Sequence, residues 1–410
     1  MDRRAFLALA AAGLAQSANA QAPAPADLLG ATGETYFLTW LNSFYPKAQA
    51  AGLPRSLVDH ELSGLSADPR VAALDTRQPE FAKPVSDYIH GVISNERVAV
   101  GRAKRTNITE FGAIEQSYGV PREILIAIWA METDFGVLQG GMDVIRCLAT
   151  LAALGRRRDW AEGELIAALR MIATGDVTRY RLRGSWAGAM GQTQLLPSTY
   201  LAEAVTIVGH GKPDIWDSPP DALGSAANLL AKSGWRRGEG WAREVILPSG
   251  FDYGLSEGPK EVPAWWTAKG VKRPGGLAWP AADTTAPAVL LLPSGASGPA
   301  FLALPNHFTI RTYNNSLAYA LGVGLLADRF GGGTGLVTPW PHETPLSLTQ
   351  RMDAQSALIK LGFNPGAPDG VVGVTTRQAL RAWQKSQGLV ADGYLTPAIV
   401  DRLKASAAKA

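Results

Sequence analysis

Apolar residues recur at helical spacing along much of the chain, and the clearest case is the stretch 121–136. It begins with a proline, which suits the first turn of a helix, and ends with a glycine, which suits its end. Counting back from Glu132 by three, four and eight residues reaches Trp129, Ile128 and Ile124, so these side chains share one stripe. The pattern predicts a helix with a carboxylate on its apolar face.

The same spacing predicts further helices over 37–51, 85–111, 160–173, 222–232 and 315–330. Alternation typical of strands is scarce before about residue 232. The stretch 253–307 is rich in proline, glycine and tryptophan and carries short apolar runs, which indicates a small strand-containing insertion. We therefore expect a mainly α fold, with its large helical domain over 35–335.

The C-terminal part has a different organisation. Glycines at 331–335 and a proline-containing stretch predict a linker over 336–345. The block 346–405 predicts a separate domain with three short helices, over 348–361, 375–387 and 396–403. Two Asp-Gly turns, at 369–370 and 392–393, lie 23 residues apart and precede the second and third helices, which indicates a degenerate internal repeat.

The pattern of the first 20 residues predicts an export signal. Arg3 and Arg4 precede a short apolar stretch, and small residues stand at the positions that a signal peptidase reads. The arginine pair resembles a twin-arginine signal for export after folding, and an ordinary secretion signal is the alternative. Residues 21–34 are rich in alanine and proline and predict a flexible lead-in. We expect the mature protein in the periplasm.

Composition and charge narrow the class of protein. A chain of 410 residues with 46% hydrophobic and 18% charged residues is globular, and a net charge of +3 gives no argument for nucleic acid. Cys147 is the only cysteine, so no intrachain disulfide can form, and we interpret it as a core residue. It lies far from the cleavage site, so we expect no lipid anchor. No later segment is apolar enough to cross a membrane, so we expect no membrane anchor. The five histidines show no ligand spacing, and we expect no metal and no cofactor.

Three stretches carry residues suited to chemistry. On an apolar face Glu132 is expected to have a raised pKa, so that it can act as an acid; a helix-end glutamate that reaches water is the alternative. The stretch 184–200 combines close-packing glycines with Ser185 and Gln194, which suit hydroxyl- and amide-rich ligands, or it is only a tight helix crossing. The stretch 311–320 places Tyr313 and Asn314 at a helix start, where an asparagine is often only a cap.

Together these stretches resemble the lytic murein transglycosylase B family, whose folds are lysozyme-like. The resemblance covers about residues 35–335 and implies that Glu132 is the catalytic glutamate. It further implies that polar and aromatic residues line a sugar site; these are Ser185, Gln194, Tyr313, Asn314, Tyr319 and, less securely matched, Tyr88. The block 346–403 resembles the three-helix peptidoglycan-binding domain of many wall enzymes.

Two departures from the family pattern stand out. Some members carry a calcium loop, but here the stretch 208–213 lacks the carboxylates that calcium needs. Leu229 stands where relatives often place an aromatic residue, so one sugar contact is expected to be weaker.

The resemblance implies a reaction. Glycosidases ordinarily use two carboxyl groups, and no second acid is evident beside Glu132, since Asp134 points to a different side of the helix. A lone acid fits cleavage of the β-1,4 bond between N-acetylmuramic acid and N-acetylglucosamine in peptidoglycan, with closure of a 1,6-anhydro ring. The alternatives are a hydrolytic muramidase and a non-catalytic peptidoglycan-binding protein. The sequence leaves protein partners unknown.

Overall fold

The computed structural model describes residues 31–76 and 83–409, which form two compact units. The helical unit comprises residues 31–76, 100–233 and 313–315, and the mixed unit comprises 83–99, 234–312 and 316–409. The predicted export signal and most of the lead-in lie outside the described residues. Helix α1 (Ala31–Ala50) includes the last four residues of the predicted lead-in.

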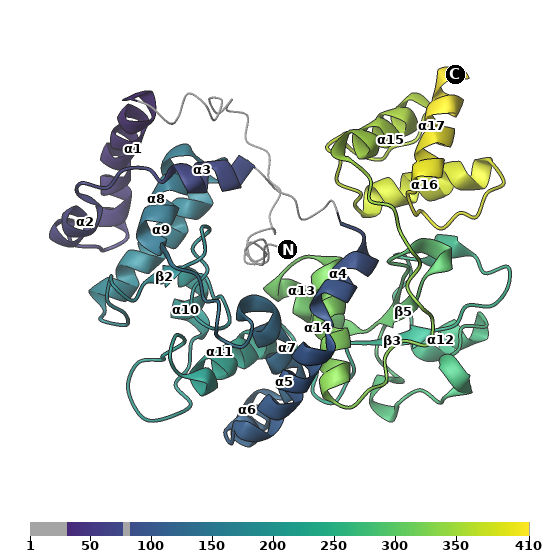
Figure 1. The fold of residues 1–410 in the computed structure, drawn as a ribbon, viewed down its shortest axis with the longest axis horizontal. Coiled ribbons are helices and arrows are strands. Elements are labelled where there is room, and N and C mark those ends of the chain that lie inside the picture. The colour runs from purple at the N-terminus through teal and green to yellow at the C-terminus, as the bar shows by residue number, and fades with distance from the viewer. Residues whose placement is uncertain (1–30, 77–82, 410) are drawn as a thin grey trace. The chain divides into compact units, whose positions relative to one another are not determined.

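The helical unit is built almost entirely from helices (Figure 1). Besides α1 they are α2 (Arg55–Leu62), α3 (Pro69–Thr76), α6 (Phe111–Tyr118), α7 (Arg122–Thr133), α8 (Val144–Leu154), α9 (Arg158–Ala173), α10 (Pro197–Glu203) and α11 (Pro219–Lys232). A two-residue antiparallel pair joins β1 (Met142–Asp143) to β2 (Arg183–Gly184). The core gathers residues from α1, α8 and α9, with Cys147 among them at 1% exposure. The interpretation of this cysteine as a core residue is confirmed, and burial raises the pKa of its thiol to about 12.

The stretch 85–111 forms two helices where the apolar spacing predicts one. Helix α4 (Val85–Val92) is followed by Ile93 as its C-terminal cap, and α5 (Asn95–Asn107) begins two residues after this cap. The first residues of α5 belong to the mixed unit and the rest to the helical unit. The hydroxyl of Ser94 accepts a hydrogen bond from the backbone N–H of Arg97 at 3.1 Å. A serine that bonds the backbone three residues on starts a new helix, so the single helix is a wrong prediction.

The mixed unit holds a three-stranded antiparallel sheet in the order β3–β5–β4. Its strands are β3 (Ala242–Val245), β4 (Val289–Leu291) and β5 (Ala300–Ala303). Strand β3 lies outside the predicted insertion, because four residues are too short a run for alternation to be recognised. Helix α12 (Pro263–Ala268) contributes Trp266 to the core beneath the sheet, and α13 (Pro305–Tyr313) follows β5.

Helix α14 (Leu317–Phe330) begins at a serine cap. The hydroxyl of Ser316 accepts from the backbone N–H of Tyr319 at 3.3 Å, so Ser316 rather than Asn314 or Asn315 starts the helix. Within the mixed unit α14 packs against α4. Tyr313 is the last residue of α13, so the predicted helix mouth is instead a short connection between two helices.

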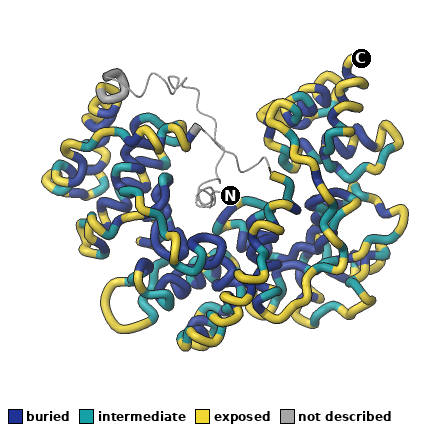
Figure 2. The backbone as a smooth tube through the Cα atoms, in the orientation of Figure 1, coloured by how far each residue is buried: buried dark blue, intermediate teal, exposed yellow. Residues whose placement is uncertain are grey.

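The C-terminal domain contains the three predicted helices, α15 (Leu348–Lys360), α16 (Val374–Ser386) and α17 (Pro397–Lys409). They enclose a separate apolar core, and Figure 2 shows their exposed residues on the outer sides. Helix α17 runs six residues beyond its predicted end.

The predicted repeat has a physical basis in two glutamines. The side-chain N–H of Gln355 donates to Asp369, and its carbonyl accepts from the backbone N–H of Gly370 at 2.7 Å. Gln384 makes the same two bonds to Asp392, at 2.9 Å, and to Gly393, at 2.8 Å. Each Asp-Gly turn is therefore fastened to the preceding helix by a buried amide.

The segment predicted as a linker, residues 336–345, is hydrogen-bonded to other parts of the mixed unit. The backbone N–H groups of Val337 and Thr338 donate to the carboxylate of Glu244 at 2.9 and 2.7 Å. Farther along, the carboxylate of Glu343 accepts from the backbone N–H of Ser86 at 3.3 Å and from the hydroxyl of Tyr394. The C-terminal domain is thus joined to the rest of its unit by polar contacts as well as by the chain.

Candidate active site

Helix α7 is buried on every side, where its sequence predicts a single apolar stripe. All residues from Ile124 to Thr133 are buried, which is the behaviour of a helix at the centre of a packed domain. Glu132 lies in its last turn and is 6% exposed, so the alternative of a glutamate that reaches bulk water does not apply. A carboxyl group in such a place loses hydration.

The chain turns sharply after this helix. Asp134 and Phe135 have φ angles of 51° and 61°, in the left-handed region that few residues other than glycine adopt. The hydroxyl of Thr133 donates to the carbonyl of Gln192 at 2.6 Å and accepts from the N–H of Gly136 at 2.9 Å. The end of α7 is therefore fastened to the stretch 184–194, which we call the polar loop.

The polar loop folds back on itself around Ser185. The hydroxyl oxygen of Ser185 accepts from the backbone N–H groups of Ala187 and Ala189 at 3.3 and 3.1 Å, and the Ser185 N–H donates to the carbonyl of Ala189 at 2.7 Å. A Cβ atom on Gly184 would stand 2.1 Å from that same carbonyl oxygen. The glycines predicted to allow close packing do so here, and they hold the serine in a fixed place.

Gln194 ends the loop in a strained conformation. Its φ is 54°, its side chain is almost wholly buried, and its amide N–H₂ donates to the carbonyls of Gln139 and Gly191 at 3.0 and 2.8 Å. Among the described residues only four other than glycine have such a φ, and three of them, including Gln194, flank this site. Strain of this kind concentrates at functional sites.

Tyr313 connects the polar loop to Glu132. Its hydroxyl donates to the backbone carbonyl of Thr193. Burial raises the pKa of the Tyr313 phenol, and the nearby carboxylate of Glu132 raises it further, which places the two side chains in one electrostatic environment. Asn314 follows and is 5% exposed. Both residues belong to the helical unit although the helices on either side of them belong to the mixed unit.

Two predicted site residues belong to the mixed unit. Tyr88 lies on α4 and is half-buried, and Tyr319 lies on α14 and is 1% exposed. The helical unit thus brings together Glu132, Ser185, Gln194, Tyr313 and Asn314, and the two tyrosines share the α4–α14 packing of the other unit. A sugar-stacking role for these two tyrosines remains a prediction.

The other buried carboxylates of the helical unit serve structure. Glu162 accepts from Trp40 and Lys47, Glu61 pairs with Arg179, and Glu164 accepts from the N–H and hydroxyl of Ser198 at 2.9 and 2.7 Å. The remaining three have the same kind of partner: Asp68 with Arg70, Asp75 with Arg156, and Asp221 with backbone N–H groups of 207–214. Glu132 differs in standing beside the polar loop and a half-buried tyrosine, Tyr313.

Ion pairs hold the stretch 208–213 and the two aspartates that follow it. The guanidinium of Arg181 donates to Asp214 at 3.1 Å and pairs with Asp217 at 2.5 Å, while Lys212 pairs with Asp176 at 2.7 Å. Within residues 31–76 and 83–409 no group of three or more His, Cys, Asp or Glu side chains is arranged to hold a metal ion. In the same ranges no helix is both long and apolar enough to cross a membrane.

Residue patterns did not identify the groups that fasten the site together. The hydroxyl of Thr133 donates to the carbonyl of Gln192, and the carbonyl of Gln139 accepts from the side chain of Gln194. The carbonyl of Thr193 accepts from the hydroxyl of Tyr313. Only Gln192 carried a signal, as an uncharged polar residue among glycines. Its side-chain N–H donates to the carbonyl of Trp216 at 3.0 Å, which ties the polar loop to the segment that precedes α11.

The chain is similar to known proteins over most of its length. A family model described as "Transglycosylase SLT domain" matches residues 36–328, and one described as "Putative peptidoglycan binding domain" matches residues 347–403. The chain is similar to the solved structure of SltB3 from Pseudomonas aeruginosa in complex with NAG-anhNAM-pentapeptide. Identity is 45% and the TM-score 0.86, with 90% of this chain and 99% of that chain covered.

Two relatives from Escherichia coli are more distant. The membrane-bound lytic murein transglycosylase B of strain K12 is 35% identical over 218 residues, which are 52% of this chain and 58% of that protein, so the match spans little more than half of it. The lytic transglycosylase Slt35, solved in complex with bulgecin A, is 28% identical with a TM-score of 0.60, over 73% of this chain and 94% of that one.

Proposed function

Because this chain belongs to the family of lytic murein transglycosylases, we propose that it cleaves the glycan strands of peptidoglycan without water. The bond would be the β-1,4 link between N-acetylmuramic acid and N-acetylglucosamine, and the product a 1,6-anhydro-N-acetylmuramic acid end. The observation that carries the proposal is the burial of Glu132 at the end of α7, beside the polar loop and Tyr313.

Glu132 would act twice. As an acid it would protonate the glycosidic oxygen, and as a carboxylate it would then take the proton from the C6 hydroxyl of the muramic residue, which attacks C1 to close the ring. A nucleophile already held in the substrate supplies a high effective molarity, and proton transfer typically contributes about 10²- to 10⁴-fold. The structural partners of the other buried carboxylates favour this single-acid scheme.

Hydrogen bonding at the site suggests which group each polar residue offers. The Ser185 oxygen already accepts two backbone N–H groups, so its own hydrogen is available to donate to a sugar oxygen, such as the acetamido carbonyl. The Gln194 amide N–H₂ is used by two carbonyls, so its carbonyl oxygen would accept from a sugar hydroxyl or N–H. Asn314 would support the developing charge, and the tyrosines would pack against sugar rings.

The Arg3-Arg4 signal supports a place of action in the periplasm after export in the folded state, and the C-terminal domain supports attachment to the wall. We propose no lipid anchor, because the lone Cys147 is buried in the core.

The test is Glu132→Gln, with Asp134→Asn as its matched control. The first removes the acid and is expected to lower cleavage of purified sacculi at least 100-fold, within the range of a lost acid–base group, while circular dichroism stays unchanged. The control removes a neighbouring carboxylate at a left-handed position that asparagine also tolerates, so cleavage should be retained.

Mass spectrometry of the digest separates the alternatives. Anhydro-muramic ends support the lyase, reducing ends would indicate a hydrolytic muramidase, and no new ends would indicate a binding protein. Activity of Glu132→Gln within about tenfold of wild type, about 1.4 kcal/mol of barrier, would contradict the role of this residue.

A further inference from the structure

A tryptophan-rich, basic segment lies on the surface of the mixed unit, at helix α12 (Figure 1). The helix carries Trp265 and Trp266, and the chain that follows returns to the helix at Trp279. The indole N–H of Trp279 donates to the hydroxyl of Thr267 at 2.9 Å, which closes the segment into a loop. We call residues 265–279 the tryptophan turn. It contains none of the residues predicted for the sugar site.

The tip of the tryptophan turn is apolar and exposed. Leu277 is 59% exposed, and the two glycines before it, Gly275 and Gly276, have φ angles of 65° and 69°. A Cβ atom added to either glycine would meet no other part of the chain within 4 Å, so the tip stands in open space. The guanidinium of Arg273 donates to the carbonyl of Ala278 and so holds the two sides of the tip together. The fold therefore presents a leucine to the solvent on a fixed turn.

Two tryptophans accompany this tip with their rings partly exposed. Trp265 and Trp279 are half-buried, whereas Trp266 is wholly buried in the core beneath the sheet. The ammonium group of Lys269 lies 4.8 Å from the centre of the Trp265 ring. An indole ring joins an apolar body to a polar N–H group, which suits a boundary between water and an apolar phase.

The charge of the tryptophan turn is of one sign. It contains three cations, Lys269, Lys272 and Arg273, and no carboxylate. The nearby carboxylate of Asp283 is already paired with Arg243 at 2.6 Å. Burial lowers the pKa of Arg273, the charge of Arg243 lowers it further, and Asp283 offsets this only in part. Among the described residues no carboxylate lies within ion-pair distance of the three cations.

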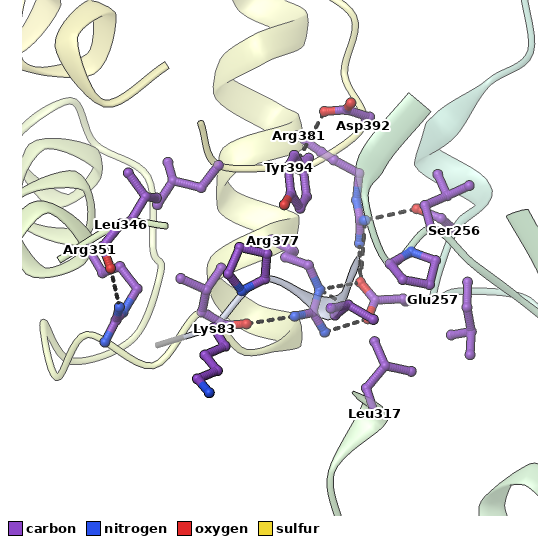
Figure 3. Close-up of a pocket in the computed structure, with 18 of the residues that line it drawn as sticks. Lys83, Ser256, Glu257, Leu317, Leu346, Arg351, Arg377, Arg381, Asp392 and Tyr394 are labelled. Atoms are coloured by element: carbon purple, nitrogen blue, oxygen red, sulfur yellow. Dashed lines mark hydrogen bonds and ion pairs between the residues drawn. The ribbon is translucent and has the colours of Figure 1, made fainter. Parts of the chain in front are cut away.

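The arginines around the turn at Glu257 provide a contrast (Figure 3). Glu257, whose φ is 58°, accepts from Arg377 at 2.9 Å and from Arg381 at 3.2 Å. Arg351, in the same region, donates to two backbone carbonyls. These cations are held by protein groups, and those of the tryptophan turn remain available to an anion from outside the chain.

This combination favours a lipid surface over a protein partner. A single exposed leucine is ordinary, but here it shares one segment with two half-exposed indoles and three cations. The anchor residues of protein interfaces lie in well-packed pockets, whereas this tip projects into open space. Anionic headgroups attract lysine and arginine, while the acyl region beneath them takes up apolar side chains.

We propose that the tryptophan turn is a contact surface for an anionic phospholipid bilayer. Leu277 enters the boundary of the acyl region, Trp265 and Trp279 lie at the level of the headgroups, and the three cations lie against lipid phosphates. Contact of this kind is reversible and lies on the bilayer, so it differs from a lipid anchor and from a spanning helix. It is independent of the cleavage proposed above.

The test is sedimentation of the chain from Gln21 onward with lipid vesicles. The predicted export signal is left out because its apolar stretch would itself bind lipid. Vesicles with equal parts of phosphatidylglycerol and phosphatidylcholine should bind the protein at least about tenfold more tightly than phosphatidylcholine alone, since each cation near an anionic surface contributes about fivefold. Added salt should reduce this preference, because it screens the charges.

Two variants with matched controls assign the binding to this surface. Leu277→Ser should weaken binding to the anionic vesicles at least about fivefold, and Lys272→Glu at least about tenfold. Val390→Ser and Lys385→Glu alter an exposed apolar residue and an exposed lysine of the C-terminal domain, and should bind as wild type does. All four positions are exposed, so circular dichroism should stay unchanged.

Fluorescence shows whether the turn reaches the acyl region. Bromine atoms on the acyl chains should quench the tryptophan fluorescence of bound wild type, and should quench Trp279→Phe less. Equal binding to the two kinds of vesicle, or an equal loss in the control variants, would overturn the proposal. Binding to polyglutamate without binding to vesicles would also overturn it and would indicate an acidic protein partner instead.

Discussion

The polar loop of the helical unit and the turn at Glu257 of the mixed unit are both strained, largely buried and packed against distant parts of the chain, but they are held by different forces. The polar loop, residues 184–194, contains no ionisable residue and is fixed by backbone hydrogen bonds and close glycine contacts. The Glu257 carboxylate is fixed by the guanidinium groups of Arg377 and Arg381, 120 and 124 residues away.

The difference matches what each region has to hold. In the proposed function the polar loop would present neutral hydrogen-bonding groups to a sugar, and a charge on this loop would shift the pKa of Glu132. The turn at Glu257 joins two domains, and paired charges there fix one register of contact. Hydrogen bonds fix the polar loop and ion pairs fix the turn at Glu257, so the stability of the two regions should respond differently to substitution and to pH.

The largest effect is expected for Glu257→Gln. The substitution leaves two arginines without a countercharge, with side chains 24% and 8% exposed, and should destabilise the packing of the C-terminal domain by about 3 kcal/mol. Hydrogen exchange of the amides in α16 is the measurement, because local opening of this domain appears there first. Asp353→Asn, which breaks an exposed ion pair with Lys404, is the control and should cost less than about 1 kcal/mol.

The pH dependence of this effect has a definite sign. Burial opposes ionisation of Glu257, but the hydrogen bonds and charge of Arg377, joined by those of Arg381, outweigh it and hold the pKa below the ordinary value. Its contribution is therefore complete above the unfolded pKa, about 4.5, and is lost as pH falls through the folded pKa. Wild type and Glu257→Gln should converge in acid; a gap that stays constant to pH 3 would contradict the ionic account.

A smaller, pH-independent effect is expected for Gly184→Ala. The added Cβ would meet the carbonyl oxygen of Ala189 at 2.1 Å, a backbone atom that cannot turn aside, so we expect about 2 kcal/mol of destabilisation of the helical unit. Calorimetric unfolding at pH 5 and pH 8 should show the same loss. Gly163→Ala, in α9 with open space around it, is the control and should be neutral or slightly stabilising.

The smallest expected effect concerns Glu164, a buried acid held by neutral donors. Burial raises its pKa, and the hydroxyl and N–H of Ser198 only partly offset this. A carboxyl group with a raised pKa stabilises the fold at low pH and loses that contribution as pH rises through the folded pKa. Glu164→Gln should therefore gain stability relative to wild type between pH 4 and pH 8, by about 1 kcal/mol. A difference that is flat or of opposite sign would show that Ser198 compensates the charge fully.

The sequence predicts the features that are specified by neighbouring residues and misses those that depend on contacts between distant ones. Local patterns identify the α7 helix with its acid, the polar loop with its glycines and the two Asp-Gly turns, because each is specified by residues close together in the chain. They miss the bonds from Thr133 to Gln192 and from Glu257 to Arg377, which join residues 59 and 120 positions apart. They also miss the break at Ile93, where a single serine cap outweighs a continuous apolar spacing.

Residues 313–315 belong to one unit while their neighbours on both sides belong to the other, and this bears on when the helical unit can finish folding. The hydrogen bond from the Tyr313 hydroxyl to the carbonyl of Thr193 joins residues 120 positions apart, so the helical unit is completed only after residue 313 has been synthesised. A chain interleaved in this way completes the folding of its helical unit only after most of the chain has been synthesised. Under the proposed export in the folded state, which the Arg3-Arg4 pair supports, these contacts would form before transport.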